Sequence, residues 1–217
     1  MEHFQYFLDF FLHLDKELES IMREYKASTY AILCLIIFCE TGLVATPFLP
    51  GDSLLFAAGM LTASTGILNV YLLIAMLILS AIIGDNVNYF IGKRIGEKIF
   101  DLPILKKIIK RSYLERTQAY YEKHGGKTII MARFVPIVRT FAPFAAGLGK
   151  MNYTKYILFC IIGGILWVSG LTMAGYLFGG IPVVKNNFEK VIFAIIGISV
   201  LPIIFGLIKS KMTTNKN

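Results

Sequence analysis

The chain has 217 residues, of which 56% are hydrophobic and 17% are charged, and its mean hydropathy is +0.65. A soluble domain of average composition carries a charge on about a quarter of its residues. Residues 53–84, 156–184 and 191–208 contain no Asp, Glu, Lys, Arg or His, and about 20 apolar residues suffice for a helix to cross a bilayer. These features exclude an ordinary soluble protein and predict an all-α polytopic membrane protein.

Residues 1–26 alternate aromatic and acidic positions, which is typical of an amphipathic helix lying on the membrane surface. The acidic residues argue against a cleavable signal peptide, whose apolar stretch would not tolerate them. From residue 27 to 208 we expect a single membrane domain.

Two segments of that domain are predicted to enter the membrane and turn back. The first, residues 27–64, begins with an apolar stretch too short to cross and is then broken by Pro47, Pro50 and Gly51. The second, residues 128–149, is broken at Pro136. Irregular backbone at membrane depth is tolerated only where protein buries it or where it lines a wet cavity.

Three further segments are predicted to cross the membrane: residues 67–92, 155–180 and 191–208. A polar tail, residues 209–217, follows. Residues 93–127 hold ten Lys or Arg and account for much of the net charge of +8, so the positive-inside rule places this segment in the cytoplasm. Because it is tethered between membrane segments, nucleic-acid binding is excluded.

Three pairs of short motifs recur in the same order. They are Phe-x-Pro at 48–50 and 134–136, Phe-Ala-Ala-Gly at 56–59 and 144–147, and Tyr-x-x-Gly at 89–92 and 176–179, with offsets of 86, 88 and 87. One such match is uninformative, but three at nearly one offset indicate a duplicated unit of hairpin plus crossing helix. With the basic segment inside, the two hairpins would open to opposite sides. That is an inverted repeat, an architecture in which transporters place substrate sites near the midplane.

Arg133 and Arg139 lie in the second hairpin, on either side of Pro136. A charge at the bilayer centre costs about 2.5–3.5 kcal/mol even on a lenient scale, so each arginine needs a partner. Cations on a broken helix inside a membrane predict an anion site, and arginine binds phosphate well. Snorkelling of either arginine to the headgroup region is the simpler alternative.

Glu40 and Asp52 belong to the first hairpin, and we expect them to oppose the two arginines. Pairing would offset part of the burial cost. Burial disfavours the ionised form of a carboxylate, whereas a neighbouring arginine favours it. These acids are therefore candidates for proton exchange. Asp52 also suits an N-cap of the following helix. Asp85 is interpreted as a packing group or as a partner for a loop cation. A supporting role in the predicted anion site is left open for Asp85, Pro50, Gly51 and Pro136.

Neither a metal site nor an enzyme is expected. The three cysteines, Cys34, Cys39 and Cys160, lie in apolar segments without CxxC spacing and are interpreted as packing residues. No histidine lies in either hairpin, and phosphatase chemistry needs a nucleophile or general base. Trp167 is interpreted as a packing or interface residue, and Gly163 and Gly164 as sites of close helix packing. No cofactor is predicted.

Several of these motifs together resemble the DedA family, within the wider SNARE-associated (VTT-domain) superfamily. They are Phe-Leu-Pro-Gly-Asp-Ser at 48–53, Gly-Asp at 84–85 with Tyr-Phe-Ile-Gly at 89–92, and Arg-Phe-Val-Pro-Ile-Val-Arg-Thr at 133–140 followed by Ala-Ala-Gly at 145–147. The resemblance covers roughly residues 25–205. It implies a bacterial inner-membrane protein with two re-entrant hairpins that moves lipids between leaflets. The family's important acids match Glu40 and Asp52, and its arginines match Arg133 and Arg139.

The leading hypothesis is a flippase for undecaprenyl phosphate or a related anionic phospholipid, linked to the proton motive force. Arg133 and Arg139 would hold the phosphate, while Glu40 and Asp52 would exchange protons and pair with the arginines. Two alternatives stay open: a proton-coupled antiporter of small cations or drugs, and a phospholipid scramblase without coupling. The expected partners are membrane lipids and protons, and a homo-oligomer is left open.

Overall fold

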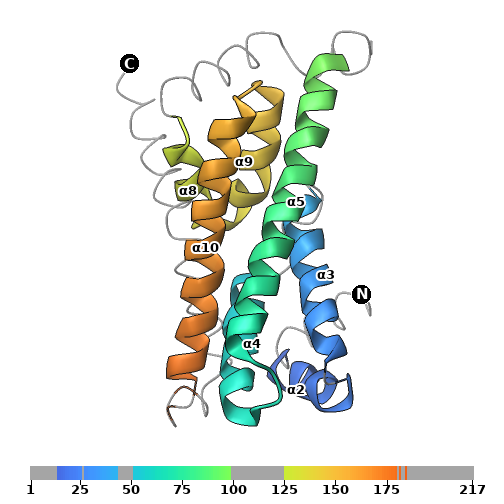
Figure 1. The fold of residues 1–217 in the computed structure, drawn as a ribbon, viewed down its shortest axis with the longest axis vertical. Helices are drawn as coiled ribbons and strands as arrows, with labels where there is room; N and C mark the ends of the chain where they lie inside the picture. The colour runs from blue at the N-terminus through green and yellow to red at the C-terminus, as the bar shows by residue number, and fades with distance from the viewer. Residues whose placement is uncertain are drawn as a thin grey trace, which may run out of the picture. The chain divides into compact units, whose positions relative to one another are not determined.

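The computed structural model describes residues 14–25, 27–43, 51–98 and 125–179, together with residues 181 and 184. Within these ranges every regular element is an α-helix, and turns or short irregular stretches connect the helices (Figure 1). Several predictions lie outside them: the start of the surface helix, the turn with Pro47 and Pro50, most of the basic segment, the last crossing at 191–208 and the tail.

Among the described residues, two helices are long and apolar enough to cross a membrane: α5 (Val70–Lys98, with its apolar part at Val70–Ile95) and α10 (Tyr153–Phe178). Both begin after an asparagine. The Asn69 Oδ1 accepts hydrogen bonds from the amides of Tyr71 and Leu72, at 3.0 and 3.1 Å, and the Asn152 Oδ1 accepts one from the amide of Lys155 at 3.2 Å. These are N-caps, which satisfy amides that have no partner within the helix.

The helices of the two predicted hairpins are shorter. The first hairpin contains α3 (Ser28–Gly42) and α4 (Gly51–Thr65), and the second contains α8 (Lys127–Ala132) and α9 (Pro136–Leu148). The predicted break at Pro136 is present: Val135 has extended backbone, as the residue before a proline prefers, and α9 begins at the proline.

The chain forms two compact units. Unit 1 is drawn from residues 1–29, 50–72 and 171–217, and unit 2 from residues 30–49 and 73–170. The helices α5 and α10 therefore each contribute to both units.

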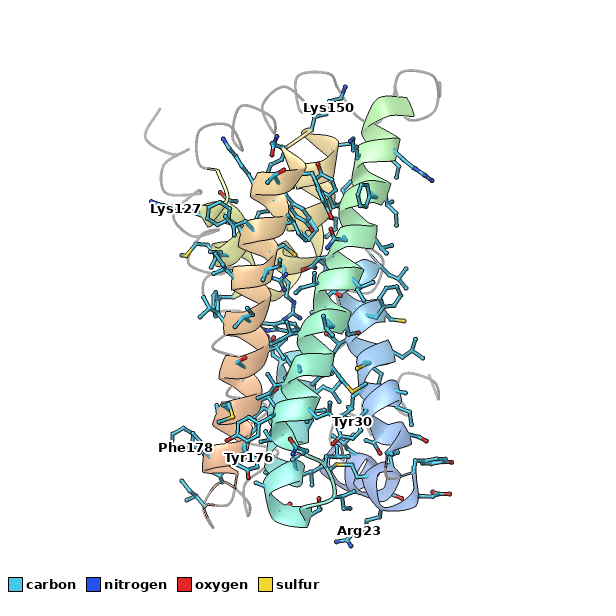
Figure 2. All side chains as sticks on the ribbon, viewed as in Figure 1. Arg23, Tyr30, Lys127, Lys150, Tyr176 and Phe178 are labelled. Atoms are coloured by element: carbon cyan, nitrogen blue, oxygen red, sulfur yellow. The ribbon has the colours of Figure 1, made fainter. Side chains whose placement is uncertain are left out.

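In unit 1, α2 (Leu14–Tyr25) packs against α4. Leu18 and Met22, one turn apart on α2, are buried, whereas Arg23 and Glu24 are exposed. The described part of the N-terminal segment is therefore amphipathic. Tyr176 and Phe178 extend from the last turn of α10 (Figure 2), which is where aromatic side chains commonly meet a membrane interface.

The same type of helix crossing occurs in both units. In unit 1, a Cβ added to Gly59 of α4 would collide with the Thr172 carbonyl of α10, and one added to Gly175 would collide with the Phe56 carbonyl. In unit 2, a Cβ added to Gly147 of α9 would collide with the Tyr89 carbonyl of α5, and one added to Gly92 of α5 would collide with the Phe144 carbonyl of α9. Glycine is required at all four positions because backbone meets backbone there.

These crossings correct one of the three motif matches. Gly92 corresponds to Gly175 and not to Gly179, because a Cβ on Gly179 would meet the Met60 side chain instead of a phenylalanine carbonyl. The spanning helices thus match at an offset of 83 residues, which also relates the caps Asn69 and Asn152. The Phe-Ala-Ala-Gly motifs match at 88. The two offsets differ because the connections between hairpin and helix differ in length.

In unit 2, α5 and α10 are antiparallel. The Tyr89 and Tyr156 rings stack with centroids 4.3 Å apart, while Ile82, two turns earlier on α5, faces Gly164, two turns later on α10. The helices α8 and α9 lie beside this pair (Figure 1). Lys127 and Lys150 are exposed and point away from the helices (Figure 2).

Candidate functional site

Glu40 and Arg139 form a buried ion pair in unit 2. Glu40 lies in the last turn of α3 and Arg139 in the first turn of α9, and the arginine Nη2 donates to the Glu40 Oε1. Their side chains are 1% and 3% exposed. The pair therefore joins α3 to α9, across 99 residues of sequence.

The Arg139 guanidinium also lies over an aromatic ring. Its Cζ is 4.3 Å from the ring centroid of Trp167, which is buried on α10. A desolvated cation–π contact of this kind contributes about 2 kcal/mol. Arg139 is thus held by a carboxylate and by a π face.

Arg133 and Asp85 form the second buried ion pair of unit 2. Arg133 caps the C-terminus of α8, and its Nη2 donates to the Asp85 Oδ2 of α5 and, at 3.1 Å, to the Cys160 carbonyl of α10. The Cys160 Sγ lies 3.3 Å from the same nitrogen and 3.4 Å from the Asp85 Oδ2. The Tyr156 hydroxyl donates to the Asp85 main-chain oxygen at 2.8 Å. This pair joins the end of α8 to both α5 and α10.

Part of the Arg133 guanidinium has unused donors. Its Nε and Nη1 are buried, and in the part of the chain that the structure describes they have no hydrogen-bond partner. A buried N–H without an acceptor is unfavourable by about 1–3 kcal/mol, and more for a charged group. Arg133 therefore retains unused capacity to donate hydrogen bonds inside the protein.

The arginine expectations are met in part. Both arginines are 4% exposed and ion-paired, so snorkelling to the headgroups is wrong for both. The expected pairing with a first-hairpin acid holds for Glu40 with Arg139. Arg133 instead pairs with Asp85, because the end of α8 places it against α5 and α10. Asp85 is thus neither a mere packing group nor the partner of a loop cation.

Asp52 and Gly51 belong to unit 1 and lie in the first turn of α4. Because α4 begins at Gly51, Asp52 is inside the helix and is not its N-cap residue. Its position still favours the helix, since a carboxylate near a helix N-terminus is stabilised by the helix dipole. Pro50 lies outside the described residues, and Pro136 supplies the first turn of α9.

Two residues that the sequence suggested only as packing groups contact the arginines. Trp167 packs on Arg139, and Gly163 leaves the space that the Arg133 side chain occupies: a Cβ there would lie 2.8 Å from the Arg133 Cδ and 2.9 Å from its Nε. Neither contact has a local sequence signal, because both partners are far apart in the chain. Among the described residues no group of three His, Cys, Asp or Glu is placed to hold a metal ion.

Comparison with known proteins gives consistent matches. The VTT domain matches residues 49–177. Protein DedA of Escherichia coli K12 is 53% identical over 212 residues, which cover 97% of this chain and 96% of that protein. An uncharacterized membrane protein of Mycobacterium leprae is 44% identical over 178 residues, 82% of this chain and 79% of its own.

The inner membrane protein YqjA of Escherichia coli K12 is 33% identical over 178 residues, which cover 82% of this chain and 80% of that protein. No solved structure matches the chain. The matched domain contains Asp85, Arg133, Arg139 and Trp167, and the full-length match includes Glu40 as well.

Proposed function

The chain belongs to the DedA family of VTT-domain membrane proteins, and from that premise we propose that it moves an anionic, phosphate-bearing lipid between membrane leaflets. Undecaprenyl phosphate or a related anionic phospholipid is the proposed substrate, and the proton motive force is the proposed drive. The proposed location is the bacterial inner membrane, with the basic segment 93–127 in the cytoplasm.

The observation that carries this proposal is Arg133. It is buried in a membrane protein, it keeps its charge at any physiological pH, and its Nε and Nη1 have no acceptor among the described residues. Phosphate oxygens are strong acceptors for guanidinium donors. A phosphate headgroup would satisfy these donors, while Asp85 would keep the side chain in place.

The Arg139–Glu40 pair supports the proton link. A phosphate approaching Arg139 would compete with the Glu40 carboxylate, and protonation of Glu40 would weaken its hold on the arginine. Proton uptake would then release Arg139 to the phosphate, and proton loss would restore the ion pair. Asp52 is proposed as a further proton-exchanging acid of the first hairpin.

The helix lengths support two re-entrant hairpins. At 1.5 Å per residue, the 15 residues of α3 and of α4 extend about 22 Å, and the 13 residues of α9 about 20 Å, against a hydrocarbon core of about 30 Å. The antiparallel helices α5 and α10 each carry the same glycine crossing near their C-terminal ends. This supports an inverted repeat, which is proposed here for the membrane domain.

The proposal is tested in liposomes by following the transbilayer movement of a labelled polyprenyl phosphate, with and without a pH gradient. We expect gradient-sensitive movement for the wild type and its loss for Arg139→Ala. Lys150→Ala is the control, because it also removes one positive charge but from an exposed position, and it should transport like the wild type.

Any other result would contradict part of the proposal. Equal movement with and without a gradient would identify an uncoupled scramblase. Absence of lipid movement, with proton release on addition of cations, would identify a cation antiporter. Normal transport by Arg139→Ala would remove Arg139 from the substrate site.

A further inference from the structure

Asn88 lies on α5, one turn beyond Asp85, and its side chain is fully buried. Its Nδ2 donates to two main-chain oxygens, that of Thr41 on α3 at 3.0 Å and that of Thr140 on α9 at 2.7 Å. All three residues belong to unit 2. One amide group thus connects a spanning helix with one arm from each hairpin.

The two acceptors are next to the ion pair in sequence. Thr41 follows Glu40, and Thr140 follows Arg139. The Asn88 amide therefore holds the backbone at both ends of the Glu40–Arg139 pair, although Asn88 is on a different helix from either charged residue. Thr41 is also among the last four residues of α3, whose carbonyls have no donor within the helix.

The orientation of this amide follows from its neighbours. The Nδ2 group has two hydrogens, and each meets one carbonyl oxygen. The reversed orientation would place the Oδ1 against two carbonyl oxygens. In the observed orientation the buried Oδ1 has no hydrogen-bond partner among the described residues. The two hydrogen bonds of the Nδ2 group thus fix the distance between α3 and α9, although the Oδ1 stays without a hydrogen bond among the described residues.

We propose that Asn88 is a positioning residue for the Glu40–Arg139 pair: by clamping the main chain at Thr41 and Thr140, it sets the alignment of the carboxylate with the guanidinium. A helix contact supports this function. Gly84, one turn before Asn88 on α5, packs against Gly42, the residue after Thr41, with a Cβ-to-Cα separation of 3.3 Å if a Cβ is added to Gly42. Asn88 then extends from this close crossing across to α9.

The chain contains an internal reporter for this arrangement. Trp167 is its only tryptophan, and Arg139 lies over its ring. The intrinsic fluorescence of the purified full-length protein therefore reports on the Arg139 guanidinium, and Arg139→Gln gives the reference spectrum for its loss. This readout does not depend on transport.

We expect the emission spectrum of Asn88→Ala to shift toward that of Arg139→Gln. The matched control is Ser80→Ala, because the Ser80 hydroxyl of α5 also donates to a main-chain oxygen of α3, that of Cys34, which is not adjacent in sequence to either charged residue of the Glu40–Arg139 pair. Ser80→Ala should keep the wild-type spectrum. A wild-type spectrum for Asn88→Ala, or an equal shift for Ser80→Ala, would overturn the proposal.

Asn88→Ser covers the case in which Asn88→Ala does not fold. It keeps one donor, so its spectrum should shift in the same direction but less, and a wild-type spectrum would contradict the inference. The transport readout rests on the proposed function: loss of a buried hydrogen bond should lower lipid movement about tenfold. If Asn88→Ala shifts the spectrum while the wild type moves no lipid, the positioning function stands and the proposed function fails.

Discussion

The Arg133–Asp85 and Arg139–Glu40 ion pairs, both buried in unit 2, use the same chemistry but connect different parts of the protein. Arg133 is bound to the spanning helices, through Asp85 on α5 and the Cys160 carbonyl on α10. Arg139 is bound to Glu40 of the first hairpin and lies on the Trp167 ring. The first pair attaches α8 to α5 and α10, whereas the second pair attaches α3 to α9.

This difference indicates a division of tasks. If the hairpins move against each other during transport, the Arg139–Glu40 pair is the one that must open, while Arg133–Asp85 can stay closed throughout. The pairs should therefore differ in what their loss does. Loss of the Asp85 carboxylate should mainly reduce stability, and loss of the Glu40 carboxylate should mainly change the response to a proton gradient.

The largest expected effect is that of Asp85→Asn. It removes the only carboxylate seen to contact Arg133 in the described part of the chain, and breaking one side of a buried pair costs about 3–5 kcal/mol. Since proteins of this size are stable by about 5–15 kcal/mol, we expect a marked fall in the thermal midpoint, measured by size-exclusion chromatography after heating.

Two variants sharpen that result. Replacing both partners, Asp85→Ala with Arg133→Met, should be less destabilising than Asp85→Asn alone, because no buried charge is left unpaired. Glu40→Gln should unfold at a higher temperature than Asp85→Asn, because Trp167 still contacts Arg139, but should lose gradient-sensitive transport. Equal stability of the two single variants, with gradient sensitivity kept in Glu40→Gln, would refute the division of tasks.

A smaller effect is expected where Gly163 faces Arg133. The methyl group of Gly163→Ala would lie 2.8 Å from the Arg133 Cδ, in a side chain that its ion pair holds in place. Overpacking of this kind costs about 1–3 kcal/mol, which chemical or thermal unfolding would measure. Gly164→Ala is the control from the adjacent position, because its nearest neighbour, the Ile82 Cγ1, would be at an ordinary 3.6 Å. If Gly163→Ala lowers the free energy of unfolding as little as Gly164→Ala does, the Arg133 side chain can move aside.

The smallest effect concerns the Trp167 ring. Trp167→Phe keeps an aromatic face under Arg139, whereas Trp167→Leu does not, so their stabilities should differ by the cation–π contribution, about 0.5–2 kcal/mol. In an Arg139→Met background this difference should disappear. If it persists unchanged, the ring stabilises the protein by packing alone.

Much of this organisation follows from local sequence. The uncharged stretches predict α5 and α10 because each is long enough to span a bilayer, and Pro136 ends one helix and begins the next because it lacks an amide hydrogen. The sequence also singles out Glu40, Arg133 and Arg139, because a charge in an apolar segment needs a partner. In each case the cause acts within a few residues.

Tertiary structure alone decides which partner each charge takes. Sequence reasoning placed Asp52 opposite an arginine and gave Asp85 only a possible supporting role, yet Arg133 pairs with Asp85, 48 residues away. It also had no means of finding Trp167 or Asn88, whose contacts depend on how α3, α9 and α10 pack around α5. The need for a counter-charge is a property of the residue and its solvent, whereas the identity of that counter-charge is a property of helix packing.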